Sequence, residues 1–137
     1  LTDNKNLNFS FSGLKTAVSR EIEKNRQGNN VKQSDIAASL QDTIANILCI
    51  KMKLAIELTN VKKVVVSGGV AANHKIRKSL SELCKSQNAV LIVPKPEICA
   101  DNGLMIAWVG ALKAHYNYPF DEVIKVLPRW NLTNLHC

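Results

Sequence analysis

The sequence predicts a mixed α/β domain in which parallel strands are flanked by helices. Two short segments, 61–67 and 89–93, are apolar and rich in β-branched residues, as strands in the middle of a parallel sheet are. The segment between them, 70–87, has the apolar spacing of a helix. A strand, a helix and a second strand in this order are typical of a parallel α/β unit. We therefore expect both strands to be buried on both faces.

Helical patterns also lie on either side of this unit. Apolar residues recur every fourth position over about 14–25 and predict a first helix. From Ser34, which we expect to be the N-cap, near-helical apolar spacing continues to about residue 58 and predicts one long helix facing the core. The prolines of 94–100 favour an extended loop, and the last helix is expected to begin at Asp101.

Composition places the chain among ordinary globular proteins. It has 137 residues, of which 46% are hydrophobic and 21% charged, with only 6 Gly and 4 Pro, so disordered and collagen-like classes are excluded. No apolar run is long enough for a transmembrane helix or a secretory signal, so we expect a soluble protein with no membrane partner. The first residue is Leu1 rather than Met, which is expected of a piece of a longer protein.

The charge balance favours an anionic partner. Eighteen Lys and Arg against eleven Asp and Glu give a net charge of +7, and nucleic acid is the first candidate. The alternative is that lysines on helix faces only keep the protein in solution. The four cysteines are spaced too irregularly for a zinc ribbon or a C-x-x-C redox pair, so a reducing compartment is expected.

Two loops follow the predicted strands, where ligands bind in open α/β sheets. In the first, Gly68 and Gly69 would let a ligand approach the backbone, next to free N–H groups of a new helix. Asn73 in the same loop carries a donor and an acceptor, which suit a ribose, a base edge or a phosphate. The alternative is a tight turn between a strand and a helix.

The second loop contains Asp101, whose most common role at a helix start is that of an N-cap. A single carboxylate does not identify a metal site, because metal ions take several ligands. Ahead of the first helix, Ser12, Gly13 and Lys15 resemble an anion site but lack P-loop spacing. The three histidines share no spacing with a nucleophile and are expected at the surface.

Five motifs run in order from about residue 8 to residue 130, nearly the whole chain. They are Asn8-Phe-Ser-Phe-Ser-Gly-Leu-Lys-Thr, Asp35-Ile-Ala-Ala-Ser-Leu-Gln, Val65-Val-Ser-Gly-Gly-Val-Ala-Ala-Asn, Cys99-Ala-Asp-Asn-Gly-Leu-Met-Ile-Ala and Pro128-Arg-Trp. Taken together and in this order, they resemble the C-terminal part of the tRNA adenosine threonylcarbamoyltransferase family, TsaD.

The resemblance implies part of an actin-like ATPase (ribonuclease H-like) lobe, with residues 1–137 as a C-terminal segment and the N-terminal lobe absent. It also implies that Asn73 contacts a nucleotide, that Gly68 and Gly69 form the turn beneath it, and that Asp101 ligates a metal. The expected metal is iron, with zinc or magnesium as alternatives. The family places Ser12, Gly13 and Lys15 near the cleft without an assigned contact.

The implied reaction is transfer of a threonylcarbamoyl group from threonylcarbamoyl-adenylate to the adenosine next to the anticodon of tRNA. Implied partners are tRNA, the N-terminal lobe or a complementing fragment, and a second copy or proteins of a modification complex. The bacterial cytoplasm is the expected compartment, with the mitochondrial matrix as the alternative. Because the metal's other ligands are absent, we expect the chain alone to be inactive and to associate through exposed strand edges.

Two other interpretations stay open. One is a fragment of another actin-like carbamoyltransferase or kinase, which would share the Gly-Gly and Asp-Asn loops. The other is a non-catalytic remnant of a split gene, or a basic module that only touches RNA.

Overall fold

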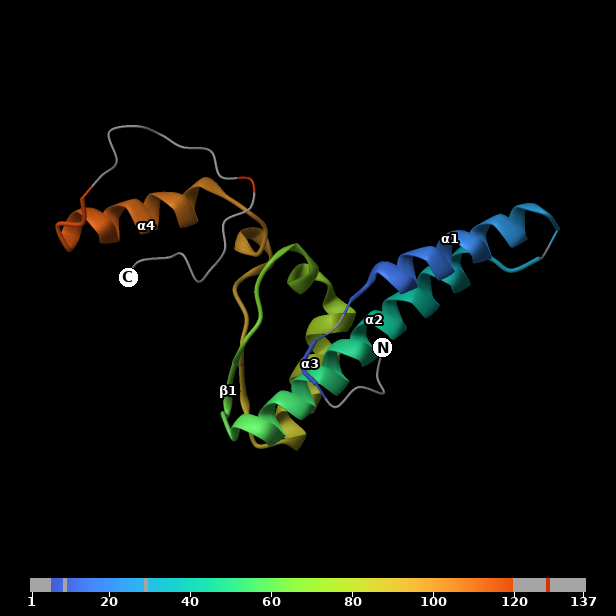
Figure 1. The fold of residues 1–137 in the computed structure, drawn as a ribbon, viewed down its shortest axis with the longest axis horizontal. Coiled ribbons are helices and arrows are strands. Elements are labelled where there is room, and N and C mark those ends of the chain that lie inside the picture. Colours follow the sequence, from blue (N-terminus) through green and yellow to red (C-terminus); the bar gives the residue numbers. More distant parts are fainter. Residues whose placement is uncertain (1–5, 9, 29, 120–127, 129–137) are drawn as a thin grey trace. The chain divides into compact units, whose positions relative to one another are not determined.

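A computed structural model of the chain describes residues 6–8, 10–28, 30–119 and 128 (Figure 1). It divides into two compact units, Leu1–Asp101 and Asn102–Cys137, and each is described by itself. Parts of the quoted motifs, including Phe9, Arg129 and Trp130, lie outside the described residues.

Two long helices begin the first unit. Helix α1 spans Ser12–Arg26 and α2 spans Gln33–Thr59, close to the predicted ranges. The two helices lie side by side (Figure 1), and apolar side chains of α1, including Leu14 and Val18, face Ile36 of α2. The period-four apolar spacing therefore marks the face of α1 that meets α2, although no residue of α1 is fully buried.

The predicted N-cap of α2 is wrong. Lys32 occupies the N-cap position with extended backbone, and no side chain caps this end. The carbonyl oxygen of Lys32 already accepts hydrogen bonds from the backbone N–H groups of Asp35, at 2.9 Å, and Ile36, at 3.3 Å. Ser34 lies inside the first turn, where its hydroxyl donates to Oδ1 of Asp35 at 3.3 Å. The helix therefore begins one residue before the predicted cap.

The strands and the helix between them form the predicted parallel unit. Strand β1 (Lys63–Val65) pairs in parallel with β2 (Val90–Ile92), with Val64 opposite Leu91. Helix α3, His74–Ser86, connects them after a short 3-10 turn, η1, at Gly69–Ala72. The mixed α/β class with two parallel strands and flanking helices is confirmed, whereas the single helix predicted over 70–87 is divided in two at Asn73.

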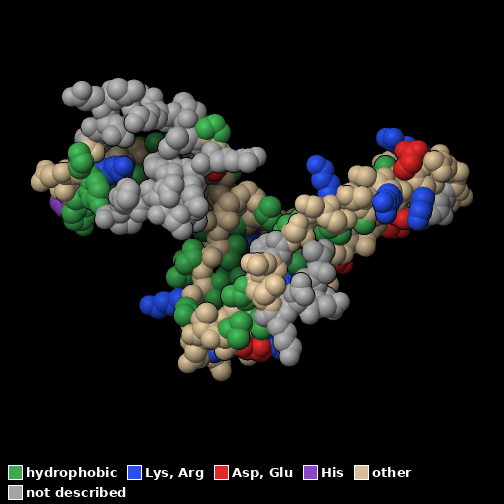
Figure 2. Space-filling model, viewed as in Figure 1, with side chains coloured by type: hydrophobic (Ala, Val, Ile, Leu, Met, Phe, Trp, Pro, Cys, Tyr) green, Lys and Arg blue, Asp and Glu red, His purple; other side chains and the backbone are tan. Residues whose placement is uncertain are grey.

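Burial of the strands on both faces is wrong for this chain. The core of Ala45, Ile76 and Leu80, from α2 and α3, covers one face, where it meets Val66 and Leu91. Side chains on the other face are exposed, among them Val65 (68%), Val90 (59%) and Ile92 (47%). Figure 2 shows hydrophobic side chains gathered over the strands. Within the described part of the chain, no second layer covers this face of the sheet.

The second unit contains helix α4, Gly103–His115, which begins two residues later than predicted. Its N-cap is Asn102, whose Oδ1 accepts a hydrogen bond from the backbone N–H of Met105 at 3.1 Å. The prediction of Asp101 as the helix start is therefore wrong, because the next residue reaches the free N–H groups. Within the described ranges, no helix is long and apolar enough to cross a membrane.

Candidate functional site

The loop after β1 needs a glycine at its first turn. Gly68 has φ of 94° and ψ of 167°, a conformation that residues with a Cβ rarely adopt. A Cβ at Gly68 or at Gly69 would meet no atom of the described residues within 4 Å. The backbone therefore explains Gly68, while nothing in the described structure requires a glycine at position 69. The open space beside both glycines is compatible with a ligand that lies against the backbone.

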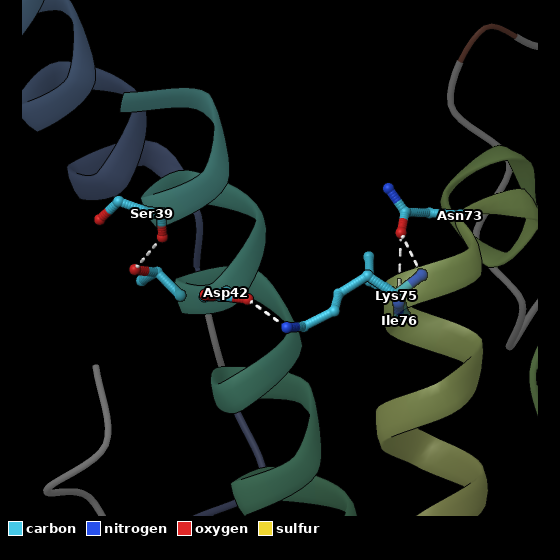
Figure 3. Close-up of polar contacts among 6 residues, drawn as sticks. Ser39, Asp42, Asn73, Lys75 and Ile76 are labelled. Carbon is cyan, nitrogen blue, oxygen red and sulfur yellow. Dashed lines mark hydrogen bonds and ion pairs between the residues drawn. The ribbon is translucent and has the colours of Figure 1, made fainter. Parts of the chain in front are cut away.

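Asn73 ends this loop as the N-cap of α3. Its Oδ1 accepts hydrogen bonds from the backbone N–H groups of Lys75, at 2.9 Å, and Ile76, at 3.2 Å. The cap satisfies two of the free N–H groups at the helix start. Figure 3 shows the amide nitrogen of Asn73 turned away from α3. This nitrogen has no hydrogen bond to the described residues, so one side of the amide holds the helix and the other can donate to a ligand.

An ion pair fixes the beginning of α3 against α2. Nζ of Lys75 lies 2.8 Å from Oδ1 of Asp42, as Figure 3 shows. The hydrogen bond to Asp42 and its negative charge raise the pKa of Lys75 above its ordinary value, and the charge of Glu82 acts in the same direction. Both paired side chains are about half exposed, so the pair orients the helix more than it stabilises the fold.

Arg77 joins the two loops that follow the strands. Its Nε donates to the carbonyl oxygen of Ala71 in the first loop. Its Nη2 donates to the carbonyl oxygen of Pro94, at 2.8 Å, and to Sγ of Cys99, at 2.9 Å, in the second. Cys99 is buried, with 4% of its surface exposed. Cys99 is therefore a buried thiol whose partner is this guanidinium.

Asp101 lies at the end of the second loop with an exposed side chain. It makes no hydrogen bond or ion pair with the described residues, and the helix cap beside it is Asn102. No group of three His, Cys, Asp or Glu side chains that could hold a metal ion occurs within the described ranges. One carboxylate does not fit a transition metal by itself, so these residues alone do not form a metal centre.

The Ser12, Gly13 and Lys15 segment begins α1. Ser12 is the first helical residue and its backbone N–H donates to Oγ of Ser10 at 3.3 Å. Gly13 and Lys15 are exposed. Phe11, the residue before this segment, lines a cavity of about 410 Å³ together with Ser67 and Val70 of the first loop, whereas Ser12, Gly13 and Lys15 do not line it. The structure thus brings the α1 start beside the Gly-Gly loop, as the motif order alone did not show.

The other cysteines and histidines do not form a further site among the described residues. Cys49, Cys84 and Cys99 are free thiols. Burial raises the pKa of Cys84, and burial, with negative charge at Cys84 and Glu82, raises the pKa of Cys49. His74 and His115 are exposed, as expected. His136 and Cys137 lie outside the described residues.

Sequence reasoning missed Arg77. It lies in α3 four positions after Asn73, the N-cap of that helix, a spacing that places two residues near the same face of a helix. That spacing is the only local signal, and an Arg inside a helix is ordinarily read as a solvated charge.

The fold and the loops together define a class of protein: an α/β chain with loops after parallel strands, which is where nucleotide-binding folds bind their ligands. A family model described as TsaD, tRNA N6-adenosine threonylcarbamoyltransferase, matches residues 1–108. The chain belongs to this family, which implies part of an actin-like ATPase fold. It is 38% identical over 135 residues to a tRNA N6-adenosine threonylcarbamoyltransferase of Wigglesworthia glossinidia brevipalpis. That alignment covers 98% of this chain and 40% of the relative, so the chain spans well under half of the relative's length.

Proposed function

We propose that this chain is the C-terminal lobe segment of a tRNA N6-adenosine threonylcarbamoyltransferase and works only with the rest of such an enzyme. The observation that carries the proposal is the family match over residues 1–108. It is supported by the loops after β1 and β2, which carry Asn73 and Asp101 at the same edge of the sheet. Its macromolecular substrate is tRNA, for which the net charge of +7 is suited. The proposed compartment is the bacterial cytoplasm.

In this proposal the first loop holds the nucleotide half of threonylcarbamoyl-adenylate. Gly68 and Gly69 leave space for the ligand against the backbone, and Nδ2 of Asn73 donates to it while Oδ1 caps α3. The exocyclic amine of the tRNA adenosine attacks the threonylcarbamoyl carbonyl carbon. The new N–C bond forms as the bond from that carbon to the phosphate oxygen breaks, the amine loses one proton, and AMP leaves. No Ser, Cys or His nucleophile of this chain takes part.

Asp101 is proposed as one ligand of a metal site that other chains or segments must complete. Its exposed carboxylate is uncommitted to the described residues, as a ligand awaiting partners must be. Iron is the expected ion, with zinc or magnesium as alternatives. Because one carboxylate does not retain such an ion, the isolated chain is expected to bind metal weakly and to transfer no threonylcarbamoyl group.

Co-expression tests the proposal. This chain is produced together with the part of the Wigglesworthia glossinidia relative that it does not match, in cells whose own transferase is depleted. Mass spectrometry of digested tRNA then measures threonylcarbamoyladenosine. We expect the modified nucleoside only when both parts are present. A different modified nucleoside would indicate another carbamoyltransferase, and no product from two folded parts would favour a non-catalytic remnant.

A further inference from the structure

The hydrogen bonding between the two strands ends before the loops begin. The last backbone bond that joins them runs from N–H of Val66 to the carbonyl oxygen of Ile92, at 3.0 Å. Beyond this bond the chain continues into the loop with Asn73 on one side and the loop with Asp101 on the other. Loops are the mobile parts of a fold, so their relative position needs a further connection if one ligand is to contact both.

The guanidinium of Arg77 supplies that connection. It reaches Ala71 in one loop and Pro94 and Cys99 in the other, through two of its nitrogen atoms. The Cys99 thiol also donates to the Pro94 carbonyl oxygen at 3.6 Å, so the second loop is closed around the same point. Arg77 is half-buried, and none of its contacts within the described residues is with a carboxylate. Its hydrogen bonds therefore go to neutral acceptors, two backbone carbonyls and a thiol.

We propose that Arg77 is a positioning residue that holds the loop of Asn73 and the loop of Asp101 in one fixed arrangement. A planar guanidinium with donors in a rigid fork can reach acceptors in two directions at once, which a lysine ammonium on a flexible stem cannot do. That the loops bind a ligand rests on the proposed function; the connection itself rests on the contacts above.

Site-resolved thiol labelling tests the connection without any ligand. The full 137-residue chain is pulsed with iodoacetamide, and the modification of Cys99 and of Cys84 is measured by peptide mass spectrometry. Cys99 reports on the loops, whereas Cys84, 1% exposed in the core, reports on general unfolding. Arg77→Met keeps an unbranched apolar stem but removes the guanidinium and its donors, and Lys78→Met on the next, exposed position is the matched control.

In Arg77→Met we expect Cys99 to be labelled about tenfold to hundredfold faster, the range for losing hydrogen bonds from a charged donor, with no change at Cys84. Lys78→Met should change neither rate. Equal acceleration of both thiols would show that Arg77 only adds general stability, and unchanged labelling would show that it holds nothing; either result overturns the proposal.

Arg77→Lys keeps the positive charge but removes the planar set of guanidinium donors, so it separates the two contributions. We expect it to leave most of the acceleration at Cys99, because one ammonium cannot replace three hydrogen bonds. Full protection in Arg77→Lys would contradict the role of the fork. If circular dichroism shows Arg77→Met to be unfolded, the decision rests on Arg77→Lys, and loss of folding in both variants would count as a merely structural role.

The reconstituted transferase distinguishes this inference from the proposed function. With both parts present, Arg77→Met should raise the KM for threonylcarbamoyl-adenylate at least about tenfold, because the same hydrogen bonds are lost. Lys78→Met should leave this KM unchanged. If the wild-type mixture makes no product, the proposed function fails and thiol labelling still decides whether Arg77 joins the loops. If the mixture is active and the KM of Arg77→Met equals that of the wild type, the positioning role is wrong while the proposed function stands.

Discussion

Nη2 of Arg77 lies 2.9 Å from Sγ of Cys99, a hydrogen bond that joins α3 to the loop after β2 across 22 positions of sequence. The same guanidinium holds the loop after β1 through Ala71. The loops of Asn73 and Asp101, in which the sequence predicted the binding residues, are therefore connected by Arg77, which lies in a helix and was not predicted to take part.

The two functions of the Asn73 amide can be separated by substitution. Asn73→Asp keeps an oxygen that accepts from Lys75 and Ile76, so the free energy of unfolding should stay within about 0.5 kcal/mol of wild type. Asn73→Ala loses the cap and should cost about 1 kcal/mol. Both variants lack the donor nitrogen, so both should lose activity in the reconstituted transferase. Urea unfolding and tRNA nucleoside analysis measure the two effects, and an active Asn73→Asp would remove the amide donor from the account.

The paired glycines should respond differently to alanine. Gly68→Ala forces a side chain into φ of 94° and should destabilise the chain by about 1 kcal/mol. In Gly69→Ala the new methyl group enters open space at an ordinary backbone angle. The free energy of unfolding should therefore change by less than about 0.5 kcal/mol. If a ligand occupies that space, Gly69→Ala still lowers transferase activity. A stable and fully active Gly69→Ala would place the ligand elsewhere.

Substitutions at the neighbouring residues Asp101 and Asn102 should have opposite effects on stability and on metal binding. Asp101→Asn should leave stability unchanged within about 0.5 kcal/mol, because its side chain is exposed and uncommitted to the described residues. Asn102→Ala removes the cap bond to Met105 and should cost about 1 kcal/mol. In the reconstituted transferase, only Asp101→Asn should lower the metal content measured by plasma mass spectrometry. Retention of metal by a folded Asp101→Asn mixture would rule out this ligand.

The pair of Lys75 and Asp42 gives a contribution that depends on pH. Because Asp42 raises the pKa of Lys75 in the folded state above its ordinary 10.5, the pair's stabilisation is fully present below about that pH. It is lost as pH rises through the folded-state pKa. The stability difference between wild type and Lys75→Gln, from urea unfolding, should therefore shrink above pH 10.5. Asp42→Asn should remove most of this dependence, and an unchanged difference at high pH would contradict the assignment.

The uncovered sheet face should make the isolated chain associate. Val65 and Val90 are 68% and 59% exposed on a two-stranded sheet whose outer edges have no further strand within the described residues. The double variant Val65→Thr and Val90→Thr should shift the chain toward the monomer in light scattering after size exclusion. Leu80→Thr, which changes the core instead, is the contrasting variant and should increase association. A monomeric wild type would show that this face needs no partner.

Local patterns predicted the elements well. Apolar spacing over 14–25 and after Ser34 matches α1 and α2, and the β-branched runs match β1 and β2. Helix starts were harder, because an N-cap depends on which side chain reaches the free N–H groups: α3 begins after Asn73 rather than at residue 70, and α4 begins after Asn102 rather than at Asp101. Strand burial was misjudged because apolar composition reports what a strand would bury in a complete sheet, and the described residues of this chain cover the strands on one face.

The candidate site was predictable only in part. Parallel topology indicated correctly that the loops of Gly68 and Asp101 follow neighbouring strands. The contact of Arg77 with Cys99 and the cavity that joins Phe11 to Ser67 depend on how α3 and α1 pack, and no local pattern encodes them.

The most direct test of the central claim is transfer in a purified mixture. This chain and the complementary part of the Wigglesworthia glossinidia relative are combined with tRNA and threonylcarbamoyl-adenylate, and the initial rate of threonylcarbamoyladenosine formation is measured. We predict transfer by the mixture and none by either part alone. Asn73→Asp in the mixture should lower the rate at least about tenfold, which corresponds to about 1.4 kcal/mol of activation free energy. Transfer by this chain alone, or none by two folded and associated parts, would contradict the central claim.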